Sequence, residues 1–205
     1  MGIHDEPRSV QACDGELAVA VARAQEGDES AFAVAYRMVQ PGLVGYLRGL
    51  VGDDAEDVAS DAWLEIARDL GRFSGDGAGF RGWTAAIARR RAMDHLRRQK
   101  GRPRSTACEQ DAQNLPRQHS THDEVLESIS TEYALRLVHG LPRDQAEAVL
   151  LRVVVGLDEP AAARVMGKRP RAVRTAGCRG LKRLARRLGV ADVTHEVPRT
   201  LGESI

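Results

Sequence analysis

The sequence contains few aromatic residues, few cysteines and no long apolar run, and each shortage excludes a class of protein. Aromatic residues make up only 4% of the 205 residues, while alanine, arginine, leucine and valine dominate, which favours helices over sheets. The three cysteines, Cys13, Cys108 and Cys178, are odd in number and far apart, so we expect reduced thiols and no disulfide framework. No run has the length of a membrane span, and the first residues lack the apolar core of a signal peptide. We therefore expect an all-α protein of the cytoplasm with no membrane span.

Charge is unevenly distributed along the chain. Charged residues make up 29% of the sequence, yet the formal net charge is only +1. The segment Phe80–Arg104 is rich in cations, and Asp94 is its only acid. One predicted helix face there is small and apolar (Ala85, Ala88, Ala92, Leu96), and another carries Trp83, Ile87, Arg90, Asp94 and Arg97. The basic face indicates a polyanionic ligand, with a merely solvated basic face as the alternative. Trp83 is interpreted first as a core residue.

Breaks in the helical pattern divide the chain into two small helical domains. We expect a disordered tail at residues 1–15, a first domain at 16–98, a flexible linker at 99–122, a second domain at 123–188 and a C-terminal tail at 189–205. In the first domain a helix is predicted from Glu16, and Asp28 is predicted to cap the next helix. Pro41 and Gly42 are predicted to end that second helix before a third one begins.

The predicted helix at 53–70 has an exposed leucine among acids. The face opposite its apolar stripe presents Asp57, Asp61, Leu64 and Glu65. Such a face is typical of a protein-docking surface, and a solvated face without a partner is the alternative. The glycine-dense segment after this helix, 71–82, is either a loop that approaches a ligand or a plain connection.

The linker contains Cys108, His119 and His122. A zinc site would need a fourth ligand and tighter cysteine spacing, so we expect no metal and no cofactor. The histidines of the chain form no constellation with acids or cysteines that would indicate catalysis. We therefore do not expect an enzyme.

The most specific pattern lies near the C-terminus. Asp158 is predicted to cap a short helix, Gly167 to supply a left-handed turn, and Pro170 to begin another helix. Ala163 is small where two crossed helices must touch, and Val173 fills the angle between them, which fits a helix-turn-helix. The second helix of this motif is expected to expose side chains that can reach phosphates and guanine edges, namely Arg171, Arg174, Thr175, Arg179, Lys182 and Arg183. A plain helical hairpin remains the alternative.

Two stretches together resemble the sigma-70 factors of bacterial RNA polymerase, in particular the extracytoplasmic-function group. DAEDVASDAWLEIARDLGRF with FRGWTAAIARRRAMDHLRR is similar to the second conserved region of that family, and LPRDQAEAVLLRVVVGL with ARVMGKRPRAVRTAGCRGLKRL is similar to the fourth. The resemblance covers about residues 16–188. It implies a protein that binds core RNA polymerase in the bacterial cytoplasm and directs promoter recognition, DNA melting and transcription initiation.

The resemblance also implies roles for individual residues. The minus-10 element of the promoter would be contacted by Gly75, Asp76, Phe80, Arg90, Asp94, Arg97 and Arg98, with residues 75–80 as the loop that captures a flipped base. The minus-35 element would be contacted by Arg169, Arg171, Arg174, Thr175, Arg179 and Lys182. Core polymerase would be contacted by Asp57, Asp61, Leu64 and Glu65 at the clamp helices of its largest subunit, and the flap of the second subunit is a further implied contact. An anti-sigma protein is the remaining implied partner.

The chain departs from the family at the start of the recognition helix. Arg169 stands at the N-cap of this helix, where family members usually have Ser or Thr. The resemblance also leaves a rival function open, a stand-alone helix-turn-helix regulator. Such a regulator would be a dimer that binds a palindromic duplex without polymerase.

Overall fold

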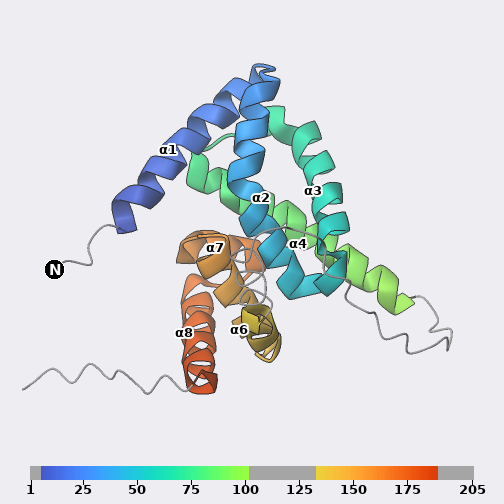
Figure 1. Cartoon of the computed structure of the whole chain (residues 1–205), viewed down its shortest axis with the longest axis vertical. Coiled ribbons are helices and arrows are strands. Elements are labelled where there is room, and N and C mark those ends of the chain that lie inside the picture. The colour runs from blue at the N-terminus through green and yellow to red at the C-terminus, as the bar shows by residue number, and fades with distance from the viewer. Residues whose placement is uncertain (1–5, 102–132, 189–205) are drawn as a thin grey trace, which may run out of the picture.

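The computed structural model describes residues 6–101 and 133–188, and every regular element in these two ranges is helical (Figure 1). No strand occurs within them, which confirms the all-α class. Residues 1–5, 102–132 and 189–205 lie outside the described part. Most of the expected linker, the first half of the helix expected from residue 123 and the expected C-terminal tail therefore also lie outside it.

The N-terminal unit is a bundle in which four helices surround one apolar core. The helices are α1 (Glu6–Gln25), α2 (Glu29–Val51), α3 (Ala55–Asp69) and α4 (Gly77–Gly101), and two short 3-10 turns connect them, η1 (Gly52–Asp54) and η2 (Leu70–Arg72). Leu17, Leu47 and Ile66 are fully buried in this core. The alanines at 85, 88 and 92 of α4 are also fully buried, as their helical spacing predicted. Small side chains on that face let α4 lie close to its neighbours.

Three element boundaries differ from those predicted. The first helix begins at Glu6, inside the segment expected to be a tail, and it continues without a break into the predicted helix. Helix α2 runs through Pro41, which was expected to end it. Proline removes one helical hydrogen bond, but Pro41 is exposed, while Val39 and Leu43 on either side of it are buried. Packing of that buried face therefore outweighs the free energy lost with the missing hydrogen bond at Pro41. Helix α4 begins at Gly77, so the predicted loop at 71–82 is much shorter.

The C-terminal unit contains the helix-turn-helix. Residues 133–139 are helical, and they are followed by α6 (Arg143–Val149), the π-helical turn η3 (Leu150–Val154), α7 (Glu159–Met166) and α8 (Pro170–Arg187). Asp158 caps α7, since its Oδ1 accepts a hydrogen bond from the Ala161 amide at 2.7 Å. Gly167 adopts the left-handed conformation, with φ 64° and ψ 34°. Ala163 and Val173 are buried where α7 and α8 meet. The predicted helix-turn-helix is confirmed.

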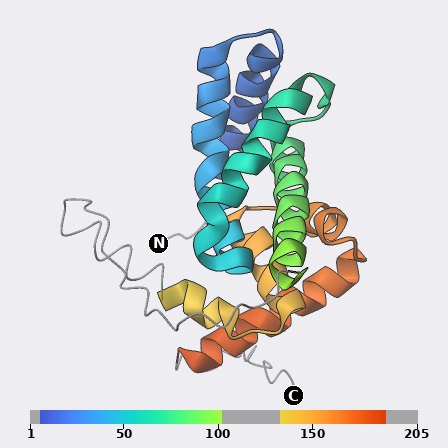
Figure 2. The same cartoon turned by 90° about the vertical axis from the view of Figure 1, so that its right-hand side faces the viewer.

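The two units pack directly against each other, and Figures 1 and 2 show the C-terminal unit seated against α2 and α4. Tyr46 of α2 and Ala85 of α4 are fully buried in the same apolar cluster as Leu150, Leu151 and the alanines of α7. Part of the apolar surface of each unit is therefore buried by the other, a contact that the sequence did not indicate. No helix within the described residues is both long and apolar enough to cross a membrane.

Candidate nucleic-acid interface

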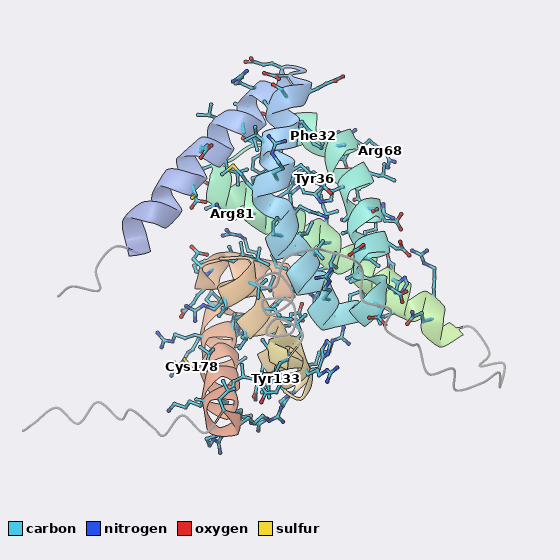
Figure 3. All side chains as sticks on the ribbon, in the orientation of Figure 1. Phe32, Tyr36, Arg68, Arg81, Tyr133 and Cys178 are labelled. Atoms are coloured by element: carbon cyan, nitrogen blue, oxygen red, sulfur yellow. The ribbon has the colours of Figure 1, made fainter. Side chains whose placement is uncertain are left out.

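Helix α8 presents one basic face to solvent. Its inner face packs through Val173, Gly177 and Gly180, which are buried. The six residues predicted to contact the minus-35 element are all exposed, namely Arg169, Arg171, Arg174, Thr175, Arg179 and Lys182. Arg169 occupies the N-cap without a side-chain hydrogen bond to the helix, so its guanidinium remains available to a ligand. Cys178 also points outward from α8 (Figure 3).

A hollow of about 540 Å³ lies beside this basic face, between α6 and α8. Arg169, Arg171 and Arg179 line one side of it, and Asp144 and Gln145 of α6 line the other. Asp144 forms an ion pair with Lys168, which offsets its negative charge. The hollow therefore favours an anion, and guanidinium groups are well suited to bind phosphate oxygens in a bidentate manner.

The second basic surface lies on α4. The side chains of Arg90 and Arg97 are 59% and 78% exposed, and Arg98 is exposed as well. Asp94 is partly exposed and accepts a hydrogen bond from Arg97 Nη1 at 3.0 Å. This edge of α4 is open to solvent, so a strand of nucleic acid could reach it.

The structure changes the interpretation of Glu65. Leu64 is 67% exposed on α3, and Asp57 and Asp61 are exposed on the same helix. Glu65 is buried, and it forms ion pairs with Arg90 and with Arg91, whose Nε lies 2.7 Å from Oε2. Adjacent residues of a helix point in directions about 100° apart, which turns Glu65 towards α4. Glu65 is therefore not on the acidic docking face.

Phe80 is also not where the sequence interpretation put it. Its side chain has no exposed surface and packs against Phe73 and Trp83, with ring centroids 5.2 and 5.7 Å away. Asp76 caps α4 by accepting a hydrogen bond from the Gly79 amide at 2.7 Å. Of the residues predicted to capture a base, Gly75 and Asp76 are exposed, whereas Phe80 supports the turn from inside the bundle.

A hollow near this turn includes residues that the sequence analysis missed. Its volume is about 210 Å³, and it is lined by Glu65, Asp69, Arg72, Trp83, Ile87 and Arg90. Trp83 is half-buried, so it belongs partly to the core and partly to this wall. The helical spacing of 83, 87 and 90 had placed three of these residues on one face. Asp69 and Arg72 come from the end of α3 and from η2, and no local pattern connects them to α4.

The described part of the chain contains no candidate metal site. No three side chains of His, Cys, Asp or Glu come together there in a group that could hold an ion. The linker residues Cys108, His119 and His122 fall outside the described residues.

Comparison with known proteins identifies the family. Residues 35–102 match sigma-70 region 2, and residues 131–184 match sigma-70 region 4. The chain is 32% identical over 175 residues to the ECF RNA polymerase sigma factor ShbA of Streptomyces griseus, and this alignment covers 80% of the chain and 91% of ShbA. The chain belongs to the extracytoplasmic-function group of the sigma-70 family. Each of the two basic surfaces lies in one of the matched regions, α4 in region 2 and α8 in region 4.

Two further comparisons agree with this assignment. The chain is 37% identical over 171 residues to the ECF RNA polymerase sigma factor BldN of Streptomyces coelicolor. This alignment covers 82% of the chain and 64% of the length of BldN. The structure of CnrH in complex with the cytosolic domain of CnrY superimposes with a TM-score of 0.57 at 20% identity, over 86% of the chain and 99% of CnrH. That likeness shows a shared fold.

Proposed function

We propose that this protein is a promoter-specificity subunit that binds core RNA polymerase and directs promoter recognition, DNA melting and transcription initiation. The observation that carries the proposal is the presence of two solvent-open basic helix faces, one in each matched region of a sigma-70 chain. Charge density of this kind binds the phosphate backbone, and the side chains between the phosphate contacts can read base edges. In this proposal the protein supplies promoter recognition, and the chemistry of RNA synthesis belongs to the polymerase.

The exposed face of α8 is proposed to enter the major groove at the minus-35 element. Arg171, Arg174 and Arg179 can each donate two hydrogen bonds to a guanine edge, and Thr175 lies between them on the same face. Arg169 and Lys182 at the two ends of this face would contact phosphates. The hollow between α6 and α8 would receive the sugar-phosphate backbone at the edge of the groove.

The exposed edge of α4 is proposed to bind the minus-10 element as single-stranded DNA. Arg90, Arg97 and Arg98 would neutralise phosphates, and Asp94 could accept a hydrogen bond from an exocyclic amine. Flipping a base out of the stack costs a few kcal/mol, which stacking and cationic contacts can offset. The hollow beside Trp83 is the proposed receptor for that base. Gly75 and Asp76 remain proposed contacts, and Phe80 acts by holding Trp83 in place.

The partners of the protein are part of the same proposal. The acidic face of α3, defined by Asp57, Asp61 and Leu64, is proposed to dock on the clamp helices of the largest polymerase subunit, and the C-terminal unit on the flap of the second subunit. An anti-sigma protein is proposed from the family resemblance. A bacterial cytoplasmic location follows from the proposal, because core polymerase and the chromosome are there.

Reconstituted transcription tests the proposal. Core polymerase with this protein is expected to start run-off transcription from a promoter that core polymerase alone ignores. Arg174→Ala should lower the yield about fivefold or more, because one bidentate base contact is worth about 1–3 kcal/mol. Arg186→Ala is the matched control, since it removes the same charge from the last turn of the same helix. A wild-type protein that binds a palindromic duplex as a dimer and never activates polymerase would instead support the stand-alone regulator.

A further inference from the structure

The last residue of α1 is hydrogen-bonded to the turn that follows α3. The side-chain amide of Gln25 donates from Nε2 to the backbone oxygens of Leu70 and Phe73, each at 2.8 Å. An amide nitrogen carries two N–H groups, so both donors of Gln25 are used on this turn. The two acceptors lie at the two ends of η2, because Leu70 begins it and Phe73 follows it. Gln25 therefore bridges η2, and it does so from a helix that lies before the segment 35–102 matching region 2.

Helix α1 also contacts the other end of the same turn, where α4 begins. Asp14 forms an ion pair with Arg81, which lies beside α1 (Figure 3). A Cβ atom added at Gly77 would collide with the backbone oxygen of Asp14. The start of α4 therefore approaches α1 as closely as glycine permits. Helix α1 thus holds the segment 70–81 at both ends.

The turn held by Gln25 forms part of the wall of the hollow beside Trp83. Arg72 of η2 lines this hollow together with Trp83. The Phe73 ring packs against Trp83, with ring centroids 5.2 Å apart. A Cβ atom added at Gly75 would lie 3.0 Å from Cζ of Phe73, so the same ring also supports Gly75, a proposed contact of the promoter. The position of Phe73 therefore fixes the hollow and Gly75 together.

The two hydrogen bonds from Gln25 can be removed without disturbing the apolar core. The side chain of Gln25 is exposed, as is that of Glu26, and neither belongs to the core cluster of the N-terminal unit. Segments with few buried contacts open locally at a smaller free energy than the whole fold. Loss of the Gln25 amide should therefore loosen η2 and Phe73 without unfolding the bundle.

We propose that Gln25 is a positioning residue for base capture, because it holds η2 and Phe73 in the conformation that receives the flipped base before DNA binds. This inference rests on the proposed function. A receptor that is already ordered loses little conformational entropy when the base enters, so more of the stacking free energy remains to offset the cost of unpairing. Without the Gln25 amide, the cost of ordering the turn falls on the base-capture step. Opening of the promoter then becomes less favourable.

A substitution that removes the two donors and keeps a side chain of similar size tests this role. With core polymerase and a duplex promoter, Gln25→Leu should give about fivefold less run-off transcript than the wild type, which corresponds to the net contribution of one hydrogen bond. Glu26→Leu is the matched control, because it places the same leucine at the adjacent exposed position. It should transcribe like the wild type, and an equal loss in both variants would overturn the proposal.

Promoters with one abasic nucleotide show whether Gln25 acts through the captured base. Abasic sites are placed one at a time along the non-template strand of the minus-10 element. At one position the abasic site should lower the wild-type yield, because it removes the captured base. On that template Gln25→Leu should cause no further loss, since both changes remove the same interaction, whereas its loss should persist at the other positions. An equal loss on every template would overturn the proposal, because a less stable fold affects all templates alike.

Hydrogen exchange in the free chain separates this proposal from the proposed function. The Phe73 amide donates to the Leu70 oxygen at 3.0 Å, and it should exchange about fivefold faster in Gln25→Leu but not in Glu26→Leu. Unchanged exchange, or wild-type transcription by Gln25→Leu, would overturn the positioning role. If the wild-type protein starts no transcription from any promoter, the proposed function fails and the role in base capture fails with it. Exchange at Phe73 still decides in that case whether Gln25 holds the turn.

Discussion

Asp28 shows how a single side chain organises the start of a helix. Its Oδ1 accepts hydrogen bonds from the Ala31 amide at 3.0 Å and from the Ser30 hydroxyl at 2.6 Å, and its Oδ2 pairs with Arg23 at 2.5 Å. All of these contacts favour the charged form, with the Ser30 hydroxyl as the largest cause. They lower the pKa of Asp28 from 3.8 to about 2.

Replacing Asp28 by alanine should therefore destabilise the protein in a pH-dependent manner. Because the folded-state pKa is lowered, the stabilisation is fully present above about pH 4 and is lost as the pH falls through about 2. The denaturant midpoint of Asp28→Ala should lie below that of the wild type at pH 7, and the two should converge near pH 2. Asp28→Asn is the control, since it keeps an oxygen acceptor at the N-cap. A difference that does not change with pH would contradict the role of the charge.

At the scale of elements, the junction between α7 and α8 combines a strong turn with a weak helix start. Gly167 provides the left-handed turn, and the Lys168 amide donates to the backbone oxygen of Ala163 at 3.0 Å. The N-cap of α8 is Arg169, which makes no capping hydrogen bond. The family departure noted in the sequence thus leaves α8 uncapped but adds a cation at the edge of the basic face.

Arg169→Ser should separate stability from DNA binding. A serine at this N-cap should raise the free energy of unfolding by about 1 kcal/mol, while the loss of the guanidinium should weaken binding to the minus-35 element. Arg169→Ala is the control, because it removes the same cation without supplying a cap, and its stability should not rise. Urea unfolding measures the first effect, and transcription at increasing salt measures the second. Unchanged promoter binding in both variants would remove Arg169 from the proposed interface.

At the scale of the whole molecule, the contact between the two units depends on how closely η3 approaches α2. Glycine at positions 45 and 49 keeps two Cβ atoms out of the contact. The buried Glu147 joins the two units by accepting hydrogen bonds from Tyr46 and Arg89. The N-terminal unit has an apolar core of its own, whereas the buried residues of the C-terminal unit form one cluster with Tyr46 and Ala85 of the N-terminal unit.

The double variant Gly45→Ala with Gly49→Ala should weaken the contact between the two units. The added Cβ atoms would clash with Val154 and Leu150, whereas α2 itself should become more stable by about 1 kcal/mol per substitution. The radius of gyration from small-angle scattering should increase. An engineered disulfide between cysteines placed at positions 82 and 161, where a Cβ at Gly82 would lie 3.8 Å from the Cβ of Ala161, should form in fewer molecules. Gly15→Ala in α1, where an added Cβ meets nothing within 4 Å, should leave both measurements unchanged. An unchanged cross-link yield in the double variant would show that the contact tolerates the methyl groups.

Local patterns were enough to determine much of this protein. The caps at Asp28 and Asp158, the turn at Gly167 and the exposed basic faces depend on residues three or four positions apart, so the sequence alone indicated the all-α class, the helix-turn-helix and the family. The positions of Glu65 and Phe80 depended instead on which helices meet. Helical spacing had placed Glu65 on the exposed face of its helix, the family resemblance had placed Phe80 in the loop that captures a base, and both side chains are buried.

Only the tertiary structure decided how the two units are joined. Tyr46 and Glu147 are 101 positions apart, and Arg89 and Glu147 are 58 apart. No periodic pattern links residues at such separations, because their contact results from burying the apolar faces of both units together. Packing inside the N-terminal unit likewise keeps α2 helical through Pro41 and brings Asp69 and Arg72 to the hollow beside Trp83.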